Sequence, residues 1–397
     1  MIAPVGWGER WRSSHDVLVA GYWDGRSGLF RTMPGAWAAL RWRKQAGAWH
    51  YWWQAHALDA LVDAVAAGDA AAGDLVRAHL QGILRRTGGD ITANDYYDDL
   101  AWMGLATLRA HRLGLLDAQV PMALAEAVLG GHDPELGGFR WRVGSALHNV
   151  AASAPAAMLL AGTSDLARDP RRLDLARDTA QWLHTHLVSA SGVVLDGCRV
   201  RDGALVPGGR VWSYNVGVVA GLDVVLAATE GGATARARLE RAARVVRAGT
   251  SVLRGPAGGL DPASGGRAGV WRDEPGPDGH LFRGILARYA TALVLADPDR
   301  TADIAADVLV QAQAAFDARD ERGRYPASWV GAAQGQPSLA AHLSGVFAVS
   351  SAARLERLAT SADGPVRDGG AVDHAFRRRH LADEADPIRG HLERGER

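Results

Sequence analysis

Residues 212–253 read WSYNVGVVAGLDVVLAATEGGATARARLERAARVVRAGTSVL and contain the repeating unit of the chain. The first part, 212–229, is apolar nearly all round, which is typical of a helix buried on every side. The second part, 233–253, carries one apolar stripe and one arginine-rich face, which is typical of a half-exposed helix. The stretch therefore predicts a hairpin made of one buried inner helix and one outer helix.

The same alternation runs through the whole sequence. Six inner and six outer helices would close into a ring of hairpins, so we predict an all-α fold, an (α/α)6 barrel, over residues 1–361. An open α-solenoid shares the helix count, but it gives no reason to gather glycine- and tryptophan-rich loops at one face. Residues 362–397 are polar and predict a mobile tail. The other inner helices are expected at about 47–66, 96–113, 146–162, 279–296 and 338–358, the other outer helices at about 10–22, 71–87, 117–129, 171–187 and 301–318, and a short extended piece at 193–195.

Composition excludes several classes of protein. Lys+Arg and Asp+Glu are both 44, so the formal charge is zero and does not support nucleic-acid binding through bulk basic charge. Cys198 is the single cysteine, which excludes an internal disulfide and a multi-cysteine metal site. The sequence shows no H-E-x-x-H motif, no secretory signal and no 18-residue apolar run. We expect no metal or cofactor, no membrane insertion and a cytoplasmic location, or secretion if the N-terminus was trimmed; oligomeric state stays open.

Tryptophan is unusually frequent, with 14 residues against 6 Phe and 7 Tyr. An indole offers a flat apolar face and an N–H donor, and both suit a sugar ring. The alternative is that several of these tryptophans are core residues with one edge toward solvent. The composition favours carbohydrate binding only modestly.

The stretch TANDYYDDLAWMGLA, residues 92–106, places two acids at the start of the second inner helix. Asp98 and Asp99 are adjacent, and their carboxyl groups can lie about 5 Å apart, a separation that suits a retaining glycosidase. One ionised carboxylate raises the proton affinity of its neighbour, so the pair can supply a nucleophile and an acid. The alternative is that both are ordinary first-turn acids favoured by the helix dipole, after an N-cap at Asn94 or Asp95.

Several motifs resemble glycoside hydrolase family 76, the α-1,6-mannanases, in the same order over about residues 47–350. The family's aromatic–Asp–Asp pattern with a nearby Trp is matched by Tyr97, Asp98, Asp99 and Trp102. The further matches are Trp52-Trp53-Gln54, the loop Gly137-Gly138-Phe139-Arg140-Trp141, His148-Asn149-Val150-Ala151, Trp212-Ser213-Tyr214-Asn215-Val216-Gly217, and Phe282 to Tyr289.

The resemblance implies an (α/α)6 barrel that hydrolyses α-1,6-linked mannose chains with retention and without a cofactor. It implies that Asp98 is the nucleophile and Asp99 the general acid/base. It implies an α-mannan-like oligo- or polysaccharide as the partner. The candidate substrate-binding residues are Trp53, Tyr97, Trp102, Trp141, Asn149, Asp196, Trp212, Tyr214 and Asn215.

Three positions depart from the family pattern. Val216 replaces a Gln, His148 replaces a Lys, and Ser153 replaces an Asn. These departures would alter the residues that recognise the sugar, so a same-fold glycosidase acting on another glycan is the first alternative. A non-catalytic glycan-binding protein is the second. Arg283 and Arg288 would meet either an anionic group of a substrate or, more commonly, a structural aspartate.

Overall fold

The computed structural model describes residues 5–34, 49–254, 269–330 and 337–362. The predicted tail therefore lies outside the described residues beyond Ala362. So do residues 265–268, the first part of the glycine- and tryptophan-containing stretch GGRAGVWR at 265–272.

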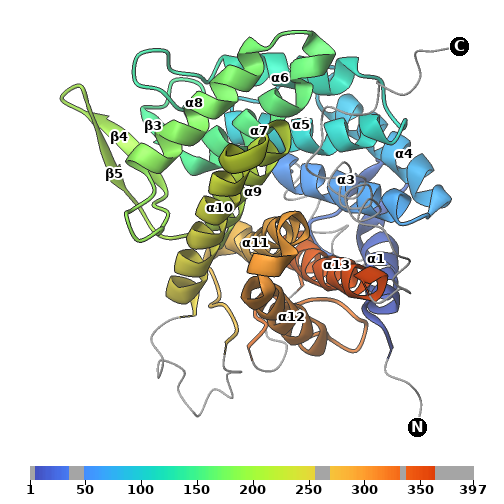
Figure 1. Cartoon of the computed structure of the whole chain (residues 1–397). Coiled ribbons are helices and arrows are strands. Elements are labelled where there is room, and N and C mark those ends of the chain that lie inside the picture. The colour runs from blue at the N-terminus through green and yellow to red at the C-terminus, as the bar shows by residue number, and fades with distance from the viewer. Residues whose placement is uncertain (1–4, 35–48, 255–268, 331–336, 363–397) are drawn as a thin grey trace, which may run out of the picture.

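Inner and outer helices alternate along the described chain, and Figure 1 labels them. Every inner and outer helix expected from the sequence is present, with bounds that differ by a few residues. The all-α prediction is therefore confirmed. The inner helices are α3 (Tyr51–Ala66), α5 (Tyr97–Arg112), α7 (Val150–Ala167), α9 (Ser213–Thr229), α11 (Gly276–Ala296) and α13 (Leu339–Ala362), and the outer helices are α1 (Trp7–Tyr22), α4 (Ala70–Arg86), α6 (Gln119–Leu129), α8 (Arg171–His186), α10 (Gly232–Leu253) and α12 (Ala302–Asp317).

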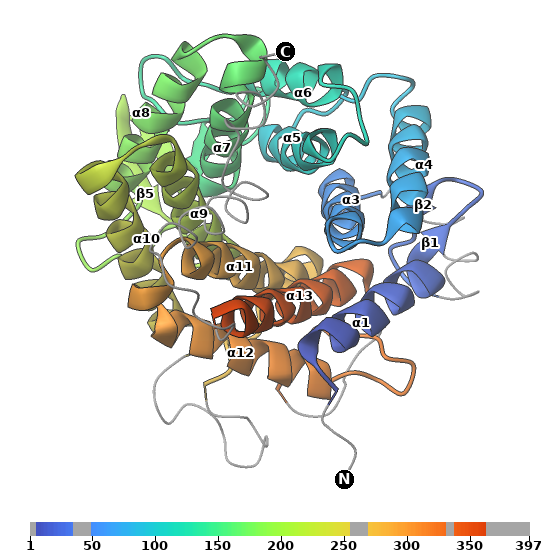
Figure 2. The same ribbon diagram turned by 45° about the vertical axis from the view of Figure 1, so that its right-hand side comes forward.

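The inner helices form a closed ring, which Figure 2 shows with the outer helices around it. Each inner helix packs against the next one in the chain, and α13 also packs against α3. The outer helices sit against this ring, as α10 does against α9 and α8 against α7. The ring places the N-terminal ends of the inner helices together at one face of the barrel.

Inner helices are buried because their sequences are apolar on all sides. In α7, every residue from Val150 to Ser164 is buried. This helix is 18 residues long and apolar enough to cross a membrane, contrary to the expectation that the sequence has no such run, yet 83% of it is buried inside the barrel, as in a core helix. Two glycines allow close crossings, because a Cβ atom would lie 2.9 Å from Leu286 Cα at Gly217 and 2.5 Å from Ser344 Cα at Gly284.

The strands are short and lie in the connections. After α1, β1 (Trp23–Asp24) pairs with β2 (Leu29–Phe30), and a second antiparallel sheet has the order β3-β4-β5, from Leu147–Asn149, Gly197–Arg201 and Ala204–Gly208. The sequence placed a helix from about 146, which is wrong for the first residues: 147–149 pair with β4, and α7 starts after the N-cap Asn149. Val194 forms a single antiparallel bridge to Val188, as the expected extended piece requires.

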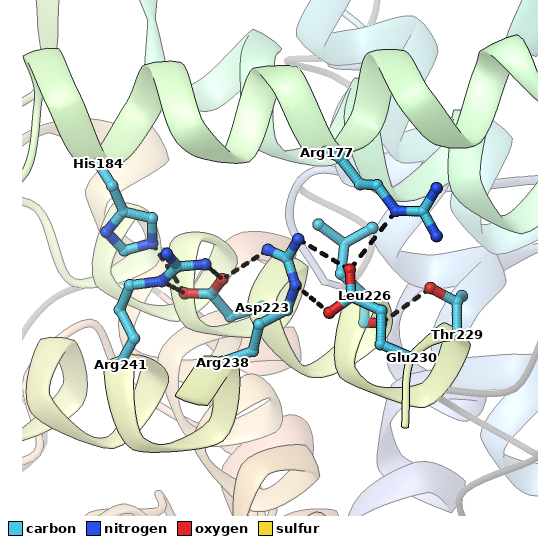
Figure 3. A network of polar contacts seen from close by, with 8 residues as sticks. All are labelled: Arg177, His184, Asp223, Leu226, Thr229, Glu230, Arg238 and Arg241. Carbon is cyan, nitrogen blue, oxygen red and sulfur yellow. Dashed lines mark hydrogen bonds and ion pairs between the residues drawn. The ribbon is translucent and has the colours of Figure 1, made fainter. Parts of the chain in front are cut away.

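A buried polar network joins α8, α9 and α10 (Figure 3). Asp223 of α9 is fully buried and accepts from His184 of α8 at 2.8 Å and from Arg241 of α10 at 2.7 Å. Burial alone would raise the pKa of Asp223, but His184 and Arg241 hold it below its usual range. Arg238 extends the network to Glu230. This aspartate therefore fastens an inner helix to two outer ones.

Candidate active site

Asp98 lies in the first turn of α5 and is fixed by two N–H donors. Its Oδ1 accepts from the backbone N–H of Asp99 at 3.1 Å, and its Oδ2 accepts from Trp141 Nε1 at 3.0 Å. Burial raises the pKa of Asp98 to about 7, although both donors act in the opposite direction. The loop before α7 thus delivers a donor to the start of α5.

Asp99 has different partners. Its Oδ2 accepts from Asn94 Nδ2 at 2.8 Å, and Asn94 also receives the backbone N–H of Tyr96. Burial, and next the charge of Asp98, raise the pKa of Asp99 well above its usual range. Among the described residues, neither carboxylate has an ion-pair partner. A pair of acids held without cations retains a proton near neutral pH.

A second group of predicted residues gathers around Asp196. Asn215 of α9 donates to Asp196 Oδ1 at 2.9 Å, and Trp212 also hydrogen-bonds the Asp196 side chain. Burial raises the pKa of Asp196. The ring of Tyr214 packs on Phe282 with centroids 4.1 Å apart. Burial, followed by the charges of Asp196 and Asp98, raises the pKa of Tyr214 well above its usual value, so this tyrosine lies near both acids.

Trp53 hydrogen-bonds to an acid, Asp278, that the sequence analysis did not identify. Its Nε1 donates to Asp278 Oδ1 at 3.1 Å, and its ring stacks on His50 with centroids 3.9 Å apart. Asp278 is exposed in the first turn of α11, and its charge acts on both Asp98 and Asp99. The signal that could have found it is the one that singled out the pair, an acid in the first turn of an inner helix.

Three predicted residues are directed elsewhere. The ring of Tyr97 packs against Gly131, where a Cβ atom would lie 2.7 Å from it. Trp102 is buried one turn below the pair and contacts His56 with ring centroids 4.7 Å apart. Asn149 caps α7, because its Oδ1 accepts from the backbone N–H of Ala152 at 3.1 Å. The side chains of Asn149 and Trp102 are both buried, and their predicted contacts with a sugar stay predictions.

The three departures from the family pattern also lie in the wall. Val216 is fully buried and faces Gly249 of α10, where a Cβ atom would lie 2.5 Å from its Cγ2. Ser153 accepts from the backbone N–H of Phe139 at 2.9 Å, and His148 Nε2 lies 3.1 Å from Asp133 Oδ2. All three side chains are buried against protein, and the expectation that they alter sugar recognition stays a prediction.

The two arginines of α11 have structural roles. Arg283 is buried and pairs with Asp273 at 2.8 Å. Arg288 pairs with Asp63 at 2.8 Å and Asp59 at 3.2 Å, both on α3. The commoner of the two interpretations, pairing with a structural aspartate, therefore holds for both. In the part of the chain that the structure describes, no three His, Cys, Asp or Glu side chains gather as a metal site.

Comparison with known proteins identifies the family. The family model of glycosyl hydrolase family 76 matches residues 14–362. The GH76A α-1,6-mannanase from Salegentibacter sp. HEL1_6 is 27% identical, with a TM-score of 0.75 over 88% of this chain and 99% of that one. An inactive variant of it, with two consecutive aspartates replaced, in complex with α-1,6-mannotetrose, is 26% identical, with a TM-score of 0.75 over 88% of this chain and all of that one.

A third structure supports the fold alone. The Lin0763 protein from Listeria innocua is 23% identical, with a TM-score of 0.77 over 89% of this chain and 99% of that one. No curated protein matches the sequence. The family match covers most of the chain, and the barrel and the motifs agree with it. The chain belongs to glycosyl hydrolase family 76.

Proposed function

We propose that the chain is a retaining hydrolase of α-1,6-linked mannose chains that uses Asp98 and Asp99. The Salegentibacter enzyme, an α-1,6-mannanase, supports the linkage. Its inactive variant has two consecutive aspartates replaced, and Asp98-Asp99 is the one pair of consecutive aspartates in this sequence. Two of the three departures, Val216 and Ser153, are fully buried and offer no direct contact to a sugar.

The unequal partners of the two aspartates carry the proposal. Two N–H donors stabilise the ionised form of Asp98, as a nucleophile requires. Asp99 stands beside that charge and holds its proton more strongly, as a general acid requires. The start of α5 adds the positive end of the helix dipole, which favours the anion.

The first step forms a glycosyl-enzyme. A carboxylate oxygen of Asp98 bonds to the anomeric carbon while the bond from that carbon to the glycosidic oxygen breaks. The electron pair of the broken bond stays on the leaving oxygen, which takes the proton of Asp99. The leaving sugar therefore departs as a neutral alcohol.

The second step reverses the roles. A water oxygen attacks the anomeric carbon, and its proton passes to Asp99, which now acts as a base. The ester bond to Asp98 breaks, and its electron pair returns to the carboxylate. Two inversions at the same carbon give net retention, and both aspartates regain their starting protonation.

The residues around Asp196 and Trp53 are the proposed sugar contacts. Asn215 and Trp212 orient the Asp196 carboxylate, which can accept a sugar hydroxyl. Tyr214 lies near both Asp196 and Asp98, and Trp141 donates to Asp98. Trp53 and its partner Asp278 belong to the neighbouring helices α3 and α11. Aromatic faces beside carboxylates suit sugar rings, because both the C–H patches and the hydroxyls find partners.

The test is hydrolysis of linear α-1,6-mannan and α-1,6-mannotetraose, followed by product chromatography and proton NMR of the new anomeric centre. We expect cleavage with the α-anomer formed first. Asp98→Asn and Asp99→Asn should abolish it. Asp95→Asn is the matched control, because Asp95 is an exposed acid on the same segment and should leave the rate unchanged. Intact substrate with wild type would refute the assignment.

Azide separates the two roles. With an aryl α-1,6-mannobioside, the good leaving group needs little protonation, so Asp99→Ala should still form the glycosyl-enzyme. Azide should then replace water and give the α-mannosyl azide. Asp98→Ala should not give this retained product. If Asp98→Ala gave it and Asp99→Ala did not, the two assignments would have to be exchanged.

A further inference from the structure

A cavity lies beside the segment that carries Trp141. This rim pocket has a volume of about 640 Å³ and is bounded by the first residue of α5, the connection from α6 to α7, and β4. Cavities of roughly 300 to 1,000 Å³ are typical of small-molecule sites. Among the residues that line it are Tyr97, Asp133, Glu135, Arg140, Ala146 and Val200.

The polar groups of the rim pocket are held in place by protein. Asp133 is buried, and its Oδ1 accepts from the backbone N–H groups of Glu135 and Leu136, each at 3.1 Å. Its Oδ2 accepts from Arg140 at 2.5 Å and lies 3.1 Å from His148 Nε2. Asp133 therefore fixes both the turn that carries Glu135 and the guanidinium of Arg140.

The charges of the rim pocket favour a neutral ligand. Arg140 is neutralised by Asp133, and the exposed Glu135 leaves one formal negative charge on the lining. That charge disfavours phosphates and carboxylates. The fixed guanidinium of Arg140 can donate to the hydroxyls of a hexose, and the carboxylate of Glu135 can accept from them. The phenol ring of Tyr97 suits its C–H faces.

The wall between the rim pocket and the aspartate pair is thin. Tyr97 lines the pocket, and the next residue is Asp98; Arg140 lines it, and the next residue is Trp141, which donates to Asp98. The two segments are joined directly, because the backbone N–H of Tyr97 donates to the carbonyl of Trp141 at 3.0 Å. A ligand in the rim pocket would therefore contact the neighbours of both groups.

We propose that the rim pocket is an accessory glycan-binding site for a neutral unit of one to three hexoses. This inference rests on the proposed function, since the ligand is taken to be part of the same mannose-based glycan. Occupancy holds the segment that carries Trp141, and it retains a polymer beside the catalytic pair.

The probe is α-1,6-mannotriose, titrated calorimetrically into the full chain with Asp98→Asn and Asp99→Asn, so that nothing is hydrolysed. We expect two molecules per chain. Adding Ala146→Trp should fill the rim pocket and leave one molecule. Val143→Trp is the matched control, because Val143 is 54% exposed on the same loop and does not line the pocket; two molecules should still bind.

A second variant guards against misfolding. Glu135→Ala removes an exposed side chain and should weaken the second binding event by about tenfold, as the loss of a charged hydrogen bond does. A single binding event in the parent, or two events with unchanged affinity in Ala146→Trp and Glu135→Ala, would overturn the inference.

The rates of the active enzyme separate this proposal from the proposed function. We expect Ala146→Trp to raise the KM for mannan severalfold and to leave kcat for mannotetraose unchanged. Two bound molecules without any hydrolysis by wild type would refute only the hydrolase. Normal hydrolysis with one bound molecule would refute only the rim pocket.

Discussion

Aspartates at the two ends of the inner helices have opposite surroundings. At the N-terminal end of α5, Asp98 and Asp99 have N–H donors but no ion-pair partner among the described residues, and burial raises both pKa values. Toward the other end, Asp63 accepts from Arg288 at 2.8 Å and from Arg109 at 2.6 Å. Burial alone would raise the pKa of Asp63, but the two arginines hold it well below its usual range.

The difference distinguishes aspartates that stabilise the barrel from aspartates that can take part in catalysis. A buried carboxylate with cations stays ionised and joins helices, as Asp63 joins α3 to α5 and α11. A buried carboxylate without cations costs folding free energy but keeps a proton available near neutral pH. The same residue type therefore serves two purposes, and the neighbours decide which one.

The largest effect is expected from removing the carboxylate of Asp98, which has no ion-pair partner among the described residues. Asp98→Asn should lower turnover of α-1,6-mannan by about a thousandfold or more, as loss of a nucleophile does. Its melting temperature should be equal to or higher than that of wild type, because a neutral amide replaces a carboxylate that burial disfavours. Rate assays and thermal unfolding on the same preparation give both numbers. A large drop in melting temperature would contradict the comparison.

The next test removes the ion pairs of Asp63 at the other end of the inner helices. Asp63→Ala should destabilise the fold by about 3 kcal/mol, because it leaves the buried Arg288 and the largely buried Arg109 without one of their acids. The rate per folded molecule should not change. Asp74→Ala, which removes an exposed partner of Arg77, is the control and should cost under about 1 kcal/mol in urea unfolding. Equal effects of the two substitutions would show that the Asp63 pairs add nothing special.

The pH dependence of kcat/KM and of stability should reveal the different surroundings of Asp98 and Asp63. With Asp98 ionising near pH 7, kcat/KM at pH 6 should be about one tenth of its plateau. Stability from Asp98 is present below the unfolded pKa of 3.8 and is lost as pH rises to about 7. Stability from Asp63, whose folded pKa is depressed, is present above 3.8 and is lost as pH falls further. Asp98→Asn should reduce the first slope, to which Asp99 and Asp196 also contribute because burial raises their pKa values, and should leave the second slope unchanged.

The smallest effect concerns the tryptophan donor. Trp141→Phe removes the N–H that lowers the pKa of Asp98, so this pKa should rise and move the acid limb of the rate profile upward. We expect a loss of about threefold in kcat/KM at pH 7, the size of one modest hydrogen bond. Trp182→Phe, which removes an N–H donated to the Leu136 carbonyl in the same connection, should leave the profile in place.

The helical ring was predictable because apolar periodicity is a local signal. Residues 212–229 are apolar on all sides and predicted α9 to within a residue. Residues 233–253 carry a single apolar stripe and predicted α10 equally well. The hairpin of β4 and β5 was missed, because its strands are short, largely exposed and lack an apolar alternation. Asn149 was placed inside a helix, since nothing local showed that 147–149 pair with β4.

The site was predictable in its residues more than in their directions. Asp98 and Asp99 were found because adjacent acids begin an apolar helix. The ring of Tyr97 packs on Gly131, just after α6, and Val216 packs on Gly249 of α10. Both directions therefore depend on residues more than 30 positions away in the chain. The hydrogen bond from Trp53 to Asp278 spans 225 residues, so periodicity within either helix does not predict it.

The seam where α13 meets α1 has a topological consequence. Glu356 of α13 accepts from the backbone N–H groups of Trp7 at 3.1 Å and Gly8 at 3.2 Å, so it satisfies the first donors of α1. The ring is thus sealed by residues almost 350 positions apart, and the helices on both sides of the seam are brought together by folding. A circular permutant opened at the exposed turn after Asp202 and joined across this seam should fold to the same barrel.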